Sequence, residues 1–217
     1  MKAKALMLCA LSVASASIAD TIFDNGRPRN EYMLYADAGV PQFLADDFTL
    51  QAGSNIITDI HWWGGYAGLP LPQVDDFTLS IYEQDAGGPA LVPFYETTVG
   101  RYTRTLSSPP DRYNNDVYEY ATFIDPLELS AGTTYYLSIT NNTYMLGSGW
   151  SWSDSCYNCS DNFFRSDPDS PWVRDFSLVR LAFYLTNDPM PVPEPTTLSL
   201  LGMGIAGLAL RRRKQRR

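Results

Sequence analysis

The chain has 217 residues and is acidic, with 24 Asp and Glu residues against 16 Lys and Arg residues. Half of the basic residues lie in the two terminal segments, so residues 20–193 carry 8 Arg, no Lys and 23 acidic residues, a formal net charge of −15. A body with this charge is repelled by nucleic acid and by anionic lipid surfaces. The charge therefore excludes nucleic-acid binding and favours a secreted domain that meets cations such as Ca²⁺.

The first segment of the chain has the layout of a secretory signal peptide. Lys2 and Lys4 precede an apolar stretch, and small residues follow as far as Ala19. Residues 1–19 are therefore predicted to be a signal peptide that signal peptidase removes after Ala19, with Ala16 as an alternative cleavage site. Export would place the body of the protein in an oxidising compartment.

The body, residues 20–190, has no helical periodicity of useful length. Short β-branched and aromatic runs alternate instead with clusters of Gly, Pro, Asn and Asp. This pattern predicts an all-β fold, a single antiparallel β-sandwich of the jelly-roll-like or immunoglobulin-like kind, and it leaves the strand order open. The eight predicted strands are Asp47–Leu50, Asn55–Trp63, Phe77–Glu83, Tyr95–Arg104, Val117–Ile124, Thr134–Asn141, Ser148–Ser153 and Phe176–Thr186.

The run Asp-Asp-Phe-Thr-Leu occurs twice, at residues 46–50 and 75–79, and is predicted to mark two similar turn-to-strand transitions. Its aspartates and several loop acids are candidate ligands for Ca²⁺, which takes roughly six to eight oxygens, usually from loops. Solvated turn acids are the alternative, and no other cofactor is predicted. The candidates are Asp46, Asp47, Asp75 and Asp76, with the loop acids Asp154, Asp161, Asp167 and Asp169.

A tyrosine corner is predicted at the start of one strand. Leu129, Gly132 and Tyr135 stand at three-residue spacing before the strand. In sandwich domains a Tyr at this place can bond back to the upstream backbone, and glycine supplies the turn.

Aromatic residues are the most suggestive candidates for ligand contacts. Sugar rings stack their apolar faces on aromatic side chains, and neighbouring Asp or Asn residues accept hydroxyl hydrogen bonds. Trp62 and Trp63 are adjacent in a predicted strand, so they point to opposite faces of the sheet. Packing in the core is the alternative for each residue. The candidate sugar-binding set is Trp62, Trp63, Tyr66, Trp150, Trp152 and Trp172.

The two cysteines of the body, Cys156 and Cys159, stand three positions apart. In an oxidising compartment, a local disulfide is favoured over a redox or metal role. The chain has no second cysteine pair, and its single histidine, His61, is distant in sequence.

Catalysis has little support in the sequence. A Ser-His-Asp triad would have to use His61, and no Gly-x-Ser-x-Gly motif supplies a nucleophile. Glycoside cleavage by a pair of carboxylates is left open as a possibility, because the distance between two carboxylates is not readable from the sequence. The protein is predicted not to be an enzyme, and no catalytic residue is assigned.

The C-terminal segment, residues 191–217, combines three features in order. A Pro-Glu-Pro motif comes first, and the uncharged residues 196–210 follow, a run short of the roughly 20 residues of a membrane-spanning helix. The terminal basic cluster would stay on the cytoplasmic side. The motif is Val192, Pro193, Glu194 and Pro195, and the cluster is Arg211, Arg212, Arg213, Lys214, Arg216 and Arg217.

This arrangement resembles the PEP-CTERM sorting signal of Gram-negative bacteria. The resemblance implies that an exosortase, a membrane-bound cysteine transpeptidase-like enzyme, recognises the motif while the hydrophobic helix is held in the inner membrane. The segment after the motif would be removed, and the protein would pass to the cell surface or the exopolysaccharide matrix. Residues 43–187 also look like a β-sandwich ectodomain found ahead of PEP-CTERM tails.

Together these features predict a secreted surface or extracellular-matrix protein with a structural or adhesive role. A non-catalytic carbohydrate-binding module for exopolysaccharide is the alternative. A calcium-dependent or hydrolytic enzyme is a third class.

Overall fold

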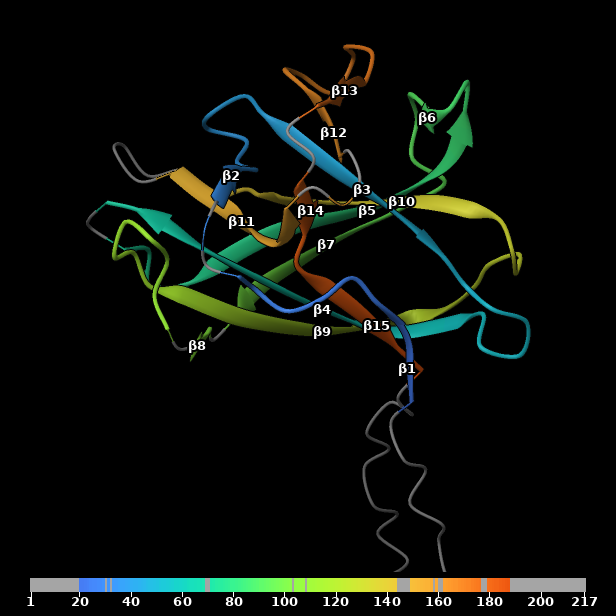
Figure 1. Ribbon diagram of the computed structural model, residues 1–217, viewed down its shortest axis with the longest axis horizontal. Helices are drawn as coiled ribbons and strands as arrows, with labels where there is room; N and C mark the ends of the chain where they lie inside the picture. Colours follow the sequence, from blue (N-terminus) through green and yellow to red (C-terminus); the bar gives the residue numbers. More distant parts are fainter. Residues whose placement is uncertain are drawn as a thin grey trace, which may run out of the picture.

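The computed structural model describes residues 20–187 except 30, 32, 69–70, 103, 108, 144–148, 158, 160–161 and 177–178. All regular structure in these residues is β-strand, arranged as two antiparallel sheets that pack face to face (Figure 1). The predicted all-β antiparallel sandwich is therefore confirmed.

Strand β4, which shares the greatest length among the described strands with β9, organises the first sheet, which has eight strands. One edge of β4 pairs with β9, and the opposite edge pairs first with β15 and then with β11. β1 extends the sheet beyond β15, β2 and β14 pair with β11, and β8 pairs with β9. The strands are β1 (Thr21–Asp24), β2 (Met33–Tyr35), β4 (Ile56–Ala67), β8 (Thr105–Ser107), β9 (Val117–Glu128), β11 (Gly149–Tyr157), β14 (Val179–Leu181) and β15 (Phe183–Thr186).

The second sheet has seven strands in the order β13-β12-β3-β10-β5-β6, with β7 paired to β5. Its strands are β3 (Phe43–Thr49), β5 (Asp75–Asp85), β6 (Gly88–Pro89), β7 (Tyr95–Tyr102), β10 (Thr134–Asn141), β12 (Asn162–Arg165) and β13 (Val173–Asp175).

Each of the eight predicted strands overlaps an observed one, and Thr134–Asn141 has the predicted bounds. The predicted strand Phe176–Thr186 is interrupted at Ala182, whose N–H donates to the Ser153 carbonyl at 2.8 Å. The strands that the sequence did not predict are β1, β2, β6, β8, β12 and β13, which have two to four residues each. So few residues cannot establish an alternating pattern.

Large aromatic side chains fill the space between the sheets. The ring of Phe77 meets the edges or faces of Trp62 and Trp150 at centroid distances of 5.2 and 5.1 Å, and Trp62 stacks on Tyr120 at 5.5 Å. Such pairs add about 0.5–1.5 kcal/mol each beyond the area that they bury. Gly64 makes this packing possible, because a Cβ there would collide with the Trp150 ring.

The repeated Asp-Asp-Phe-Thr-Leu motif has a structural counterpart. Its two copies lie in β3 and β5, which pair with opposite edges of β10. In both copies the Phe is buried in the core, as Phe48 and Phe77. The first Asp of each copy, Asp46 or Asp75, is also fully buried. The prediction of two transitions from turn to strand holds for Asp75, which begins β5, whereas Asp46 lies inside β3.

The predicted tyrosine corner is confirmed. The backbone N–H of Ser130 donates to the hydroxyl oxygen of Tyr135 at 3.2 Å, five residues downstream. Gly132 has a φ of +75°, which an L side chain rarely adopts, and its N–H donates to the Leu50 carbonyl at 2.9 Å. The corner therefore ties the turn before β10 to the end of β3.

Both ends of the described chain lie at the same pole of the sandwich. Asp20 and Asn187 are joined by a backbone hydrogen bond of 3.2 Å, and β1 and β15 pair beside them. Strands β6, β12 and β13 lie at the opposite pole (Figure 1). The molecule thus has a terminal pole and a distal pole.

Candidate functional site

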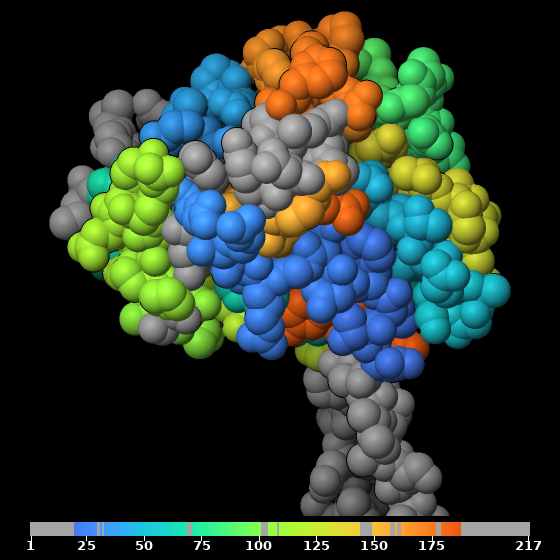
Figure 2. All heavy atoms as spheres, in the orientation of Figure 1, coloured from blue at the N-terminus to red at the C-terminus, as the bar shows by residue number. Residues whose placement is uncertain are grey.

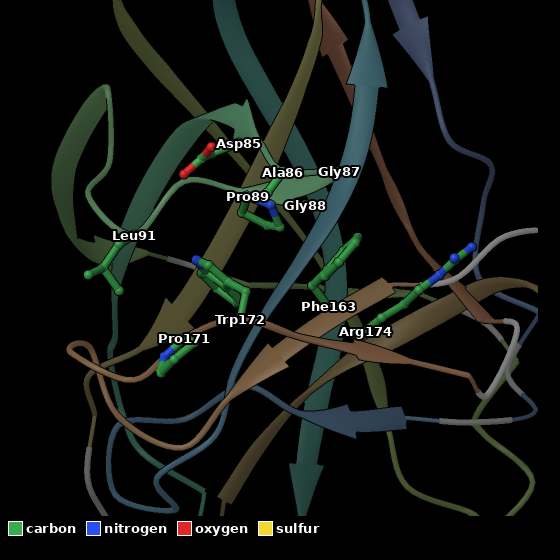
Figure 3. A pocket seen from close by; sticks show the side chains of 10 residues that line it. All are labelled: Asp85, Ala86, Gly87, Gly88, Pro89, Leu91, Phe163, Pro171, Trp172 and Arg174. Carbon is green, nitrogen blue, oxygen red and sulfur yellow. The ribbon is translucent and has the colours of Figure 1, made fainter.

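A cavity of about 610 Å³ opens at the distal pole, within the size range of ligand pockets. The β5–β6 hairpin and the β12–β13 hairpin form its walls, and these two segments lie side by side in Figure 2. We call it the distal pocket (Figure 3). Its lining residues are Asp85, Ala86, Gly87, Gly88, Pro89, Leu91, Phe163, Pro171, Trp172 and Arg174.

The pocket lies on the outer face of the seven-stranded sheet. Along β5, Ile81 points into the core between the sheets, so its neighbour Tyr82 points outward. By the same alternation Tyr136 of β10 and Phe163 of β12 lie on the outer face, where they pack edge to face at 5.4 Å. These outward-facing residues thus form a second, smaller aromatic cluster beside the pocket.

The Trp172 ring is fixed from three directions. Its Nε1–H donates to the Ala90 carbonyl at 3.1 Å, and its ring meets Tyr82 edge to face at 5.3 Å. The guanidinium carbon of Arg165 lies 4.3 Å from the ring centroid. Trp172 is nevertheless only partly buried, so a remaining part of its surface is open to the pocket.

Arg165 is 5 % exposed and sits in a box of aromatic rings. Its guanidinium lies over Phe43 and Tyr82 as well as over Trp172. Nη2 donates to the Tyr82 hydroxyl oxygen at 2.9 Å, and Nη1 donates to the Leu91 carbonyl at 3.1 Å. Within the described residues, no carboxylate lies at ion-pair distance from this cation.

The rim of the pocket is a tight two-residue hairpin. Gln84 pairs with Pro89 and Asp85 with Gly88, so Ala86 and Gly87 form the turn. Both turn residues have positive φ, +48° and +87°, as the favoured hairpin turn requires. At this positive φ, Ala86 carries backbone strain that glycine would not have. Gly88 packs closely against Phe163, since a Cβ at Gly88 would lie 2.8 Å from Cε1 of that ring.

The prediction that these residues form a sugar-binding platform at the surface is wrong for most of them. Five of its six members are at most 3 % exposed and so offer almost no ring surface to a ligand, although Tyr66 lines a second cavity that is described below. Only Trp172 lines the distal pocket. The five buried residues are Trp62, Trp63, Tyr66, Trp150 and Trp152.

The prediction that Trp62 and Trp63 face opposite ways is confirmed. Trp62 belongs to the main core, and Trp63 belongs to a separate cluster with Val117 on the other face of the sheet. That cluster is covered by the segment between β1 and β2. The Arg27 guanidinium lies 5.9 Å above the Trp63 ring, and Met33 packs against the cluster.

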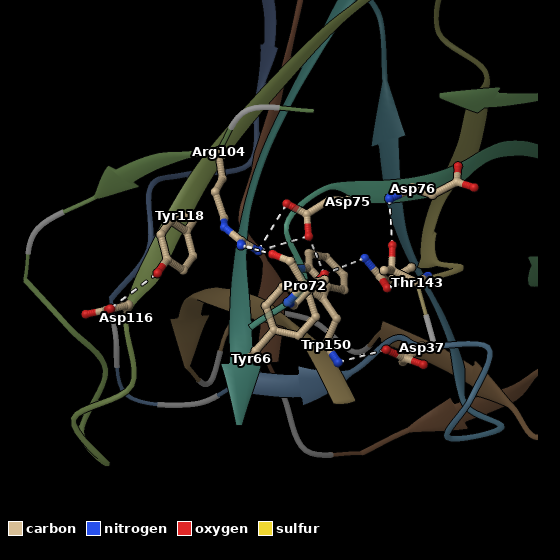
Figure 4. A network of polar contacts seen from close by, with 11 residues as sticks. Asp37, Tyr66, Pro72, Asp75, Asp76, Arg104, Asp116, Tyr118, Thr143 and Trp150 are labelled. Atoms are coloured by element: carbon tan, nitrogen blue, oxygen red, sulfur yellow. Dashed lines mark hydrogen bonds and ion pairs between the residues drawn. The ribbon is translucent and has the colours of Figure 1, made fainter. Parts of the chain in front are cut away.

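Side chains from β4, β5, β10 and the segment between β7 and β8 form a polar network (Figure 4). The Tyr66 hydroxyl donates to Asp75, and Asn141 Nδ2 donates to the Tyr66 oxygen at 3.0 Å. Arg104 Nη1 donates to both carboxylate oxygens of Asp75, at 3.1 and 3.3 Å. The Arg104 guanidinium also lies over the ring of Tyr118, 5.0 Å from its centroid. Burial raises the pKa of Asp75, although the hydrogen bond from Tyr66 and the charge of Arg104 lower it.

Tyr66 and Tyr118 also line a second cavity, of about 390 Å³, beside the loop before β9. Tyr66 is only 3 % exposed, and its hydroxyl group is held by Asp75 and Asn141. Burial raises the pKa of Tyr66, so this hydroxyl stays protonated. The network therefore braces the cavity wall.

Asp46 joins the two sheets from inside the core. Its Oδ2 accepts hydrogen bonds from the Leu181 N–H at 2.7 Å and from Asn25 Nδ2 at 2.8 Å, and its Oδ1 accepts one from the Asp47 N–H at 2.9 Å. Burial raises the pKa of Asp46 to about 7, although the backbone donors of Leu181 and Asp47 and the charge of Arg180 lower it. Asn25 stands at the start of the covering segment, so Asp46 fixes the place where that segment begins.

The structure does not gather the calcium candidates into one site. Asp46 and Asp75 are occupied by the hydrogen bonds above, and Asp47 pairs with Arg180 at 3.1 Å. Asp76 contributes its N–H to the Thr143 hydroxyl at 2.8 Å. Across the described residues, no group of three or more His, Cys, Asp or Glu side chains is placed to hold a metal ion. Calcium binding stays a prediction, and Asp161 lies outside the described residues.

Two other predictions concern His61 and the cysteine pair. His61 Nε2 lies 2.6 Å from Asp59 Oδ2, and its ring stacks on Tyr184 at 4.0 Å. The structure joins Cys156 and Cys159 in a disulfide with a Cα–Cα distance of 6.0 Å, which is within the usual range.

The predicted terminal segments, residues 1–19 and 191–217, lie outside the described residues. Within the part that the structure describes, no helix has the length and apolar character to cross a membrane.

The fold and the C-terminal motif define a class of protein. Residues 191–214 match the PEP-CTERM protein-sorting motif, which confirms the resemblance and marks a secreted β-sandwich protein that exosortase sorts. The chain belongs to the family described as Domain of unknown function (DUF7901), which covers residues 24–198. No curated protein and no solved structure matches the chain.

Proposed function

We propose that the protein is a structural or adhesive component of the cell surface or extracellular matrix of a Gram-negative bacterium, and that it acts without catalysis. The observation that supports an adhesive role best is the polarity of the domain. The sorting motif follows the terminal pole, and the distal pocket opens at the other pole.

The linker between domain and motif is short. Val192 stands five residues after Asn187, and five residues span at most about 18 Å. While the motif is held at the membrane, the terminal pole therefore stays close to it. The distal pocket then faces away from the cell, which is the placement that an adhesive domain needs.

Two features support a non-catalytic role. His61 is engaged with Asp59 and stacked on Tyr184. Two fully buried carboxylates, Asp46 and Asp75, are each held in hydrogen bonds within the protein. These three groups brace the fold in the arrangement described, and none of them lines the distal pocket.

Deletion of the gene in the producing strain tests the proposal. We expect cells without the protein to lose attachment or matrix cohesion, and expression of the full chain to restore it. A Glu194→Ala chain, altered in the Pro-Glu-Pro motif, should be exported but not sorted, and should not restore it. Unchanged attachment and matrix cohesion in the deletion strain would overturn the structural or adhesive role.

The second candidate is a non-catalytic carbohydrate-binding module. The specific observation in its favour is the distal pocket, where Trp172 and Phe163 present aromatic surface beside polar groups. Binding to the producer's exopolysaccharide in affinity gels, lost in a Trp172→Ala chain, would support it. Unretarded migration of the wild-type chain would count against it.

A further inference from the structure

The two arginines near the distal pocket are engaged within the protein. The Arg174 guanidinium lies over the Phe176 ring, 5.6 Å from its centroid, and takes part in a further interaction. Figure 3 shows it beyond Phe163 as seen from Trp172. Arg165 is buried, is hydrogen-bonded to a hydroxyl and a carbonyl group, and is not among the lining residues. Neither arginine is therefore available to hold a negative group of a ligand.

The carboxylate of Asp85, by contrast, is free to accept hydrogen bonds. Asp85 is exposed, and within the described residues its side chain has no hydrogen bond or ion pair. It stands directly opposite Gly88 in the β5–β6 hairpin, and residues in opposite positions project their side chains from the same face. A Cβ on Gly88 would meet the Phe163 ring of the pocket. The Asp85 side chain therefore lies on the face of the hairpin that borders the pocket.

The Trp172 ring offers one face to the pocket. Arg165 lies over the ring, 4.3 Å from its centroid, and does not line the pocket, so it occupies the face that is turned away. The Nε1–H of Trp172 donates to the Ala90 carbonyl at 3.1 Å and fixes the plane of the ring. In Figure 3, Asp85 and Trp172 both lie to the left of Phe163. An aromatic face and a free carboxylate are thus presented to the same ligand.

These two groups and the charge of the body select the class of ligand. The apolar face of a sugar ring packs on an aromatic face, and its hydroxyl groups donate charge-assisted hydrogen bonds to a carboxylate. An acidic sugar would bring its own carboxylate to Asp85, in a body whose net charge is −15. A cationic sugar would approach the Arg165 guanidinium behind Trp172. An uncharged sugar has the hydroxyl donors and meets neither repulsion.

We propose that the distal pocket binds an uncharged sugar ring of a polysaccharide. The ring lies against the open face of Trp172, and neighbouring hydroxyl groups of the sugar donate to the carboxylate of Asp85. This assignment rests on the second candidate function, the carbohydrate-binding module, and it adds the class of sugar and the residue that selects it.

Calorimetric titration of the full chain with three neutral sugars, galactotriose, mannotriose and cellotriose, and with trigalacturonate tests the proposal. We expect at least one neutral sugar to bind, and trigalacturonate to bind more weakly than the best neutral sugar. Asp85→Asn should weaken binding of that neutral sugar by roughly tenfold, because it removes a charge-assisted hydrogen bond. The same variant should strengthen trigalacturonate binding, because it removes a like charge. These two opposite changes distinguish selection by Asp85 from a general loss of structure.

Asp125→Asn is the matched control, because Asp125 is also exposed and lies on β9, away from the pocket. It should bind all four sugars like the wild type, and equal effects of the two Asp variants would reduce the result to net charge and overturn the proposal. Tighter binding of trigalacturonate than of every neutral sugar would overturn the preference for an uncharged ring. Unchanged neutral-sugar binding in Trp172→Ala would place the sugar elsewhere on the molecule and overturn the assignment to this pocket.

Binding of none of the four sugars would also overturn the proposal. Retardation of the wild-type chain by the producer's exopolysaccharide, and attachment of the deletion strain, judge the carbohydrate-binding module and the surface role separately.

Discussion

The outer faces of the two sheets both carry an aromatic cluster, and only one of them is open. On the eight-stranded sheet, Trp63 is 1 % exposed because the segment after β1 lies over it. On the seven-stranded sheet, Trp172 and Phe163 are only partly buried, and they line a cavity. We refer to these as the covered face and the open face.

An aromatic residue outside the main core takes its role from the chain that packs around it. Trp63 and Trp172 both lie outside the principal cluster between the sheets, and both have an arginine over the ring. Trp63 is closed by a covering segment that lies elsewhere in sequence, whereas Trp172 belongs to the β12–β13 hairpin, which leaves a cavity where it meets the β5–β6 hairpin.

The largest effect is expected on the covered face. Trp63→Ala removes a fully buried indole and should lower the free energy of unfolding by about 3–5 kcal/mol, since the cavity cannot close completely. Urea denaturation of the full chain measures it. Sugar binding at the distal pocket should be retained in the folded variant. A decrease in the free energy of unfolding of less than about 1 kcal/mol would contradict tight packing of the covering segment on Trp63.

Asp46 links the core to the start of the covering segment and should make stability depend on pH. Burial raises its pKa from 3.8 to about 7, so the folded state holds this proton more tightly than the unfolded chain does. The contribution of Asp46 to stability is thus greatest below about pH 4 and falls as the pH rises to about 7, by roughly 2–4 kcal/mol.

Urea denaturation across this pH range, compared between wild type and variants, checks the prediction. Asp46→Asn should lose this part of the pH dependence. Asp125→Asn is the control, because Asp125 is exposed on β9 and is not among the groups that act on Asp46. If the difference between wild type and Asp46→Asn did not change between about pH 4 and 7, the assigned pKa would be wrong.

On the open face, Trp172→Ala should lower the free energy of unfolding by less than Trp63→Ala does. We expect a decrease of about 1–2 kcal/mol, because the Trp172 side chain is only partly buried but holds Arg165 in place. The same urea denaturation measures the loss, and a value equal to that of Trp63→Ala would remove the contrast between the faces.

The smallest effect is expected at the rim of the open face, and it should be a gain. Ala86→Gly relieves the positive φ of +48° and should raise the free energy of unfolding by about 0.5 kcal/mol, after the entropy cost of glycine. Gly87→Ala, at a φ of +87°, is the converse variant and should destabilise the hairpin. Calorimetric melting of both chains tests the pair, and a lower melting temperature for Ala86→Gly would contradict it.

Alternation in the sequence predicted the main strands because they are long enough to repeat it. It also placed Trp62 and Trp63 on opposite faces. What alternation could not predict is whether an outward face is covered. Trp63 is covered by Arg27 and Met33, which stand 36 and 30 residues earlier in the chain. No local sequence pattern predicts that contact.

The distal pocket was only partly predictable for a related reason. Trp172 was identified by its chemistry, but Phe163 and Arg165 lie in β12, whose four residues carry no recognisable period. Arg174 and Asp85 come from different hairpins that meet only in the folded chain. The tyrosine corner, by contrast, is contained in seven consecutive residues and was predicted from them.

The pairing of β15 on both of its edges has a mechanical consequence. β15 is hydrogen-bonded to β1 on one side and to β4 on the other, and it leads directly to the end of the domain from which the sorting motif extends. In Figure 1 it runs toward the terminal pole. Tension between a surface-bound end and a ligand at the distal pole would pull β15 along its length, so the bonds of both ladders would share the load in shear and would have to break together.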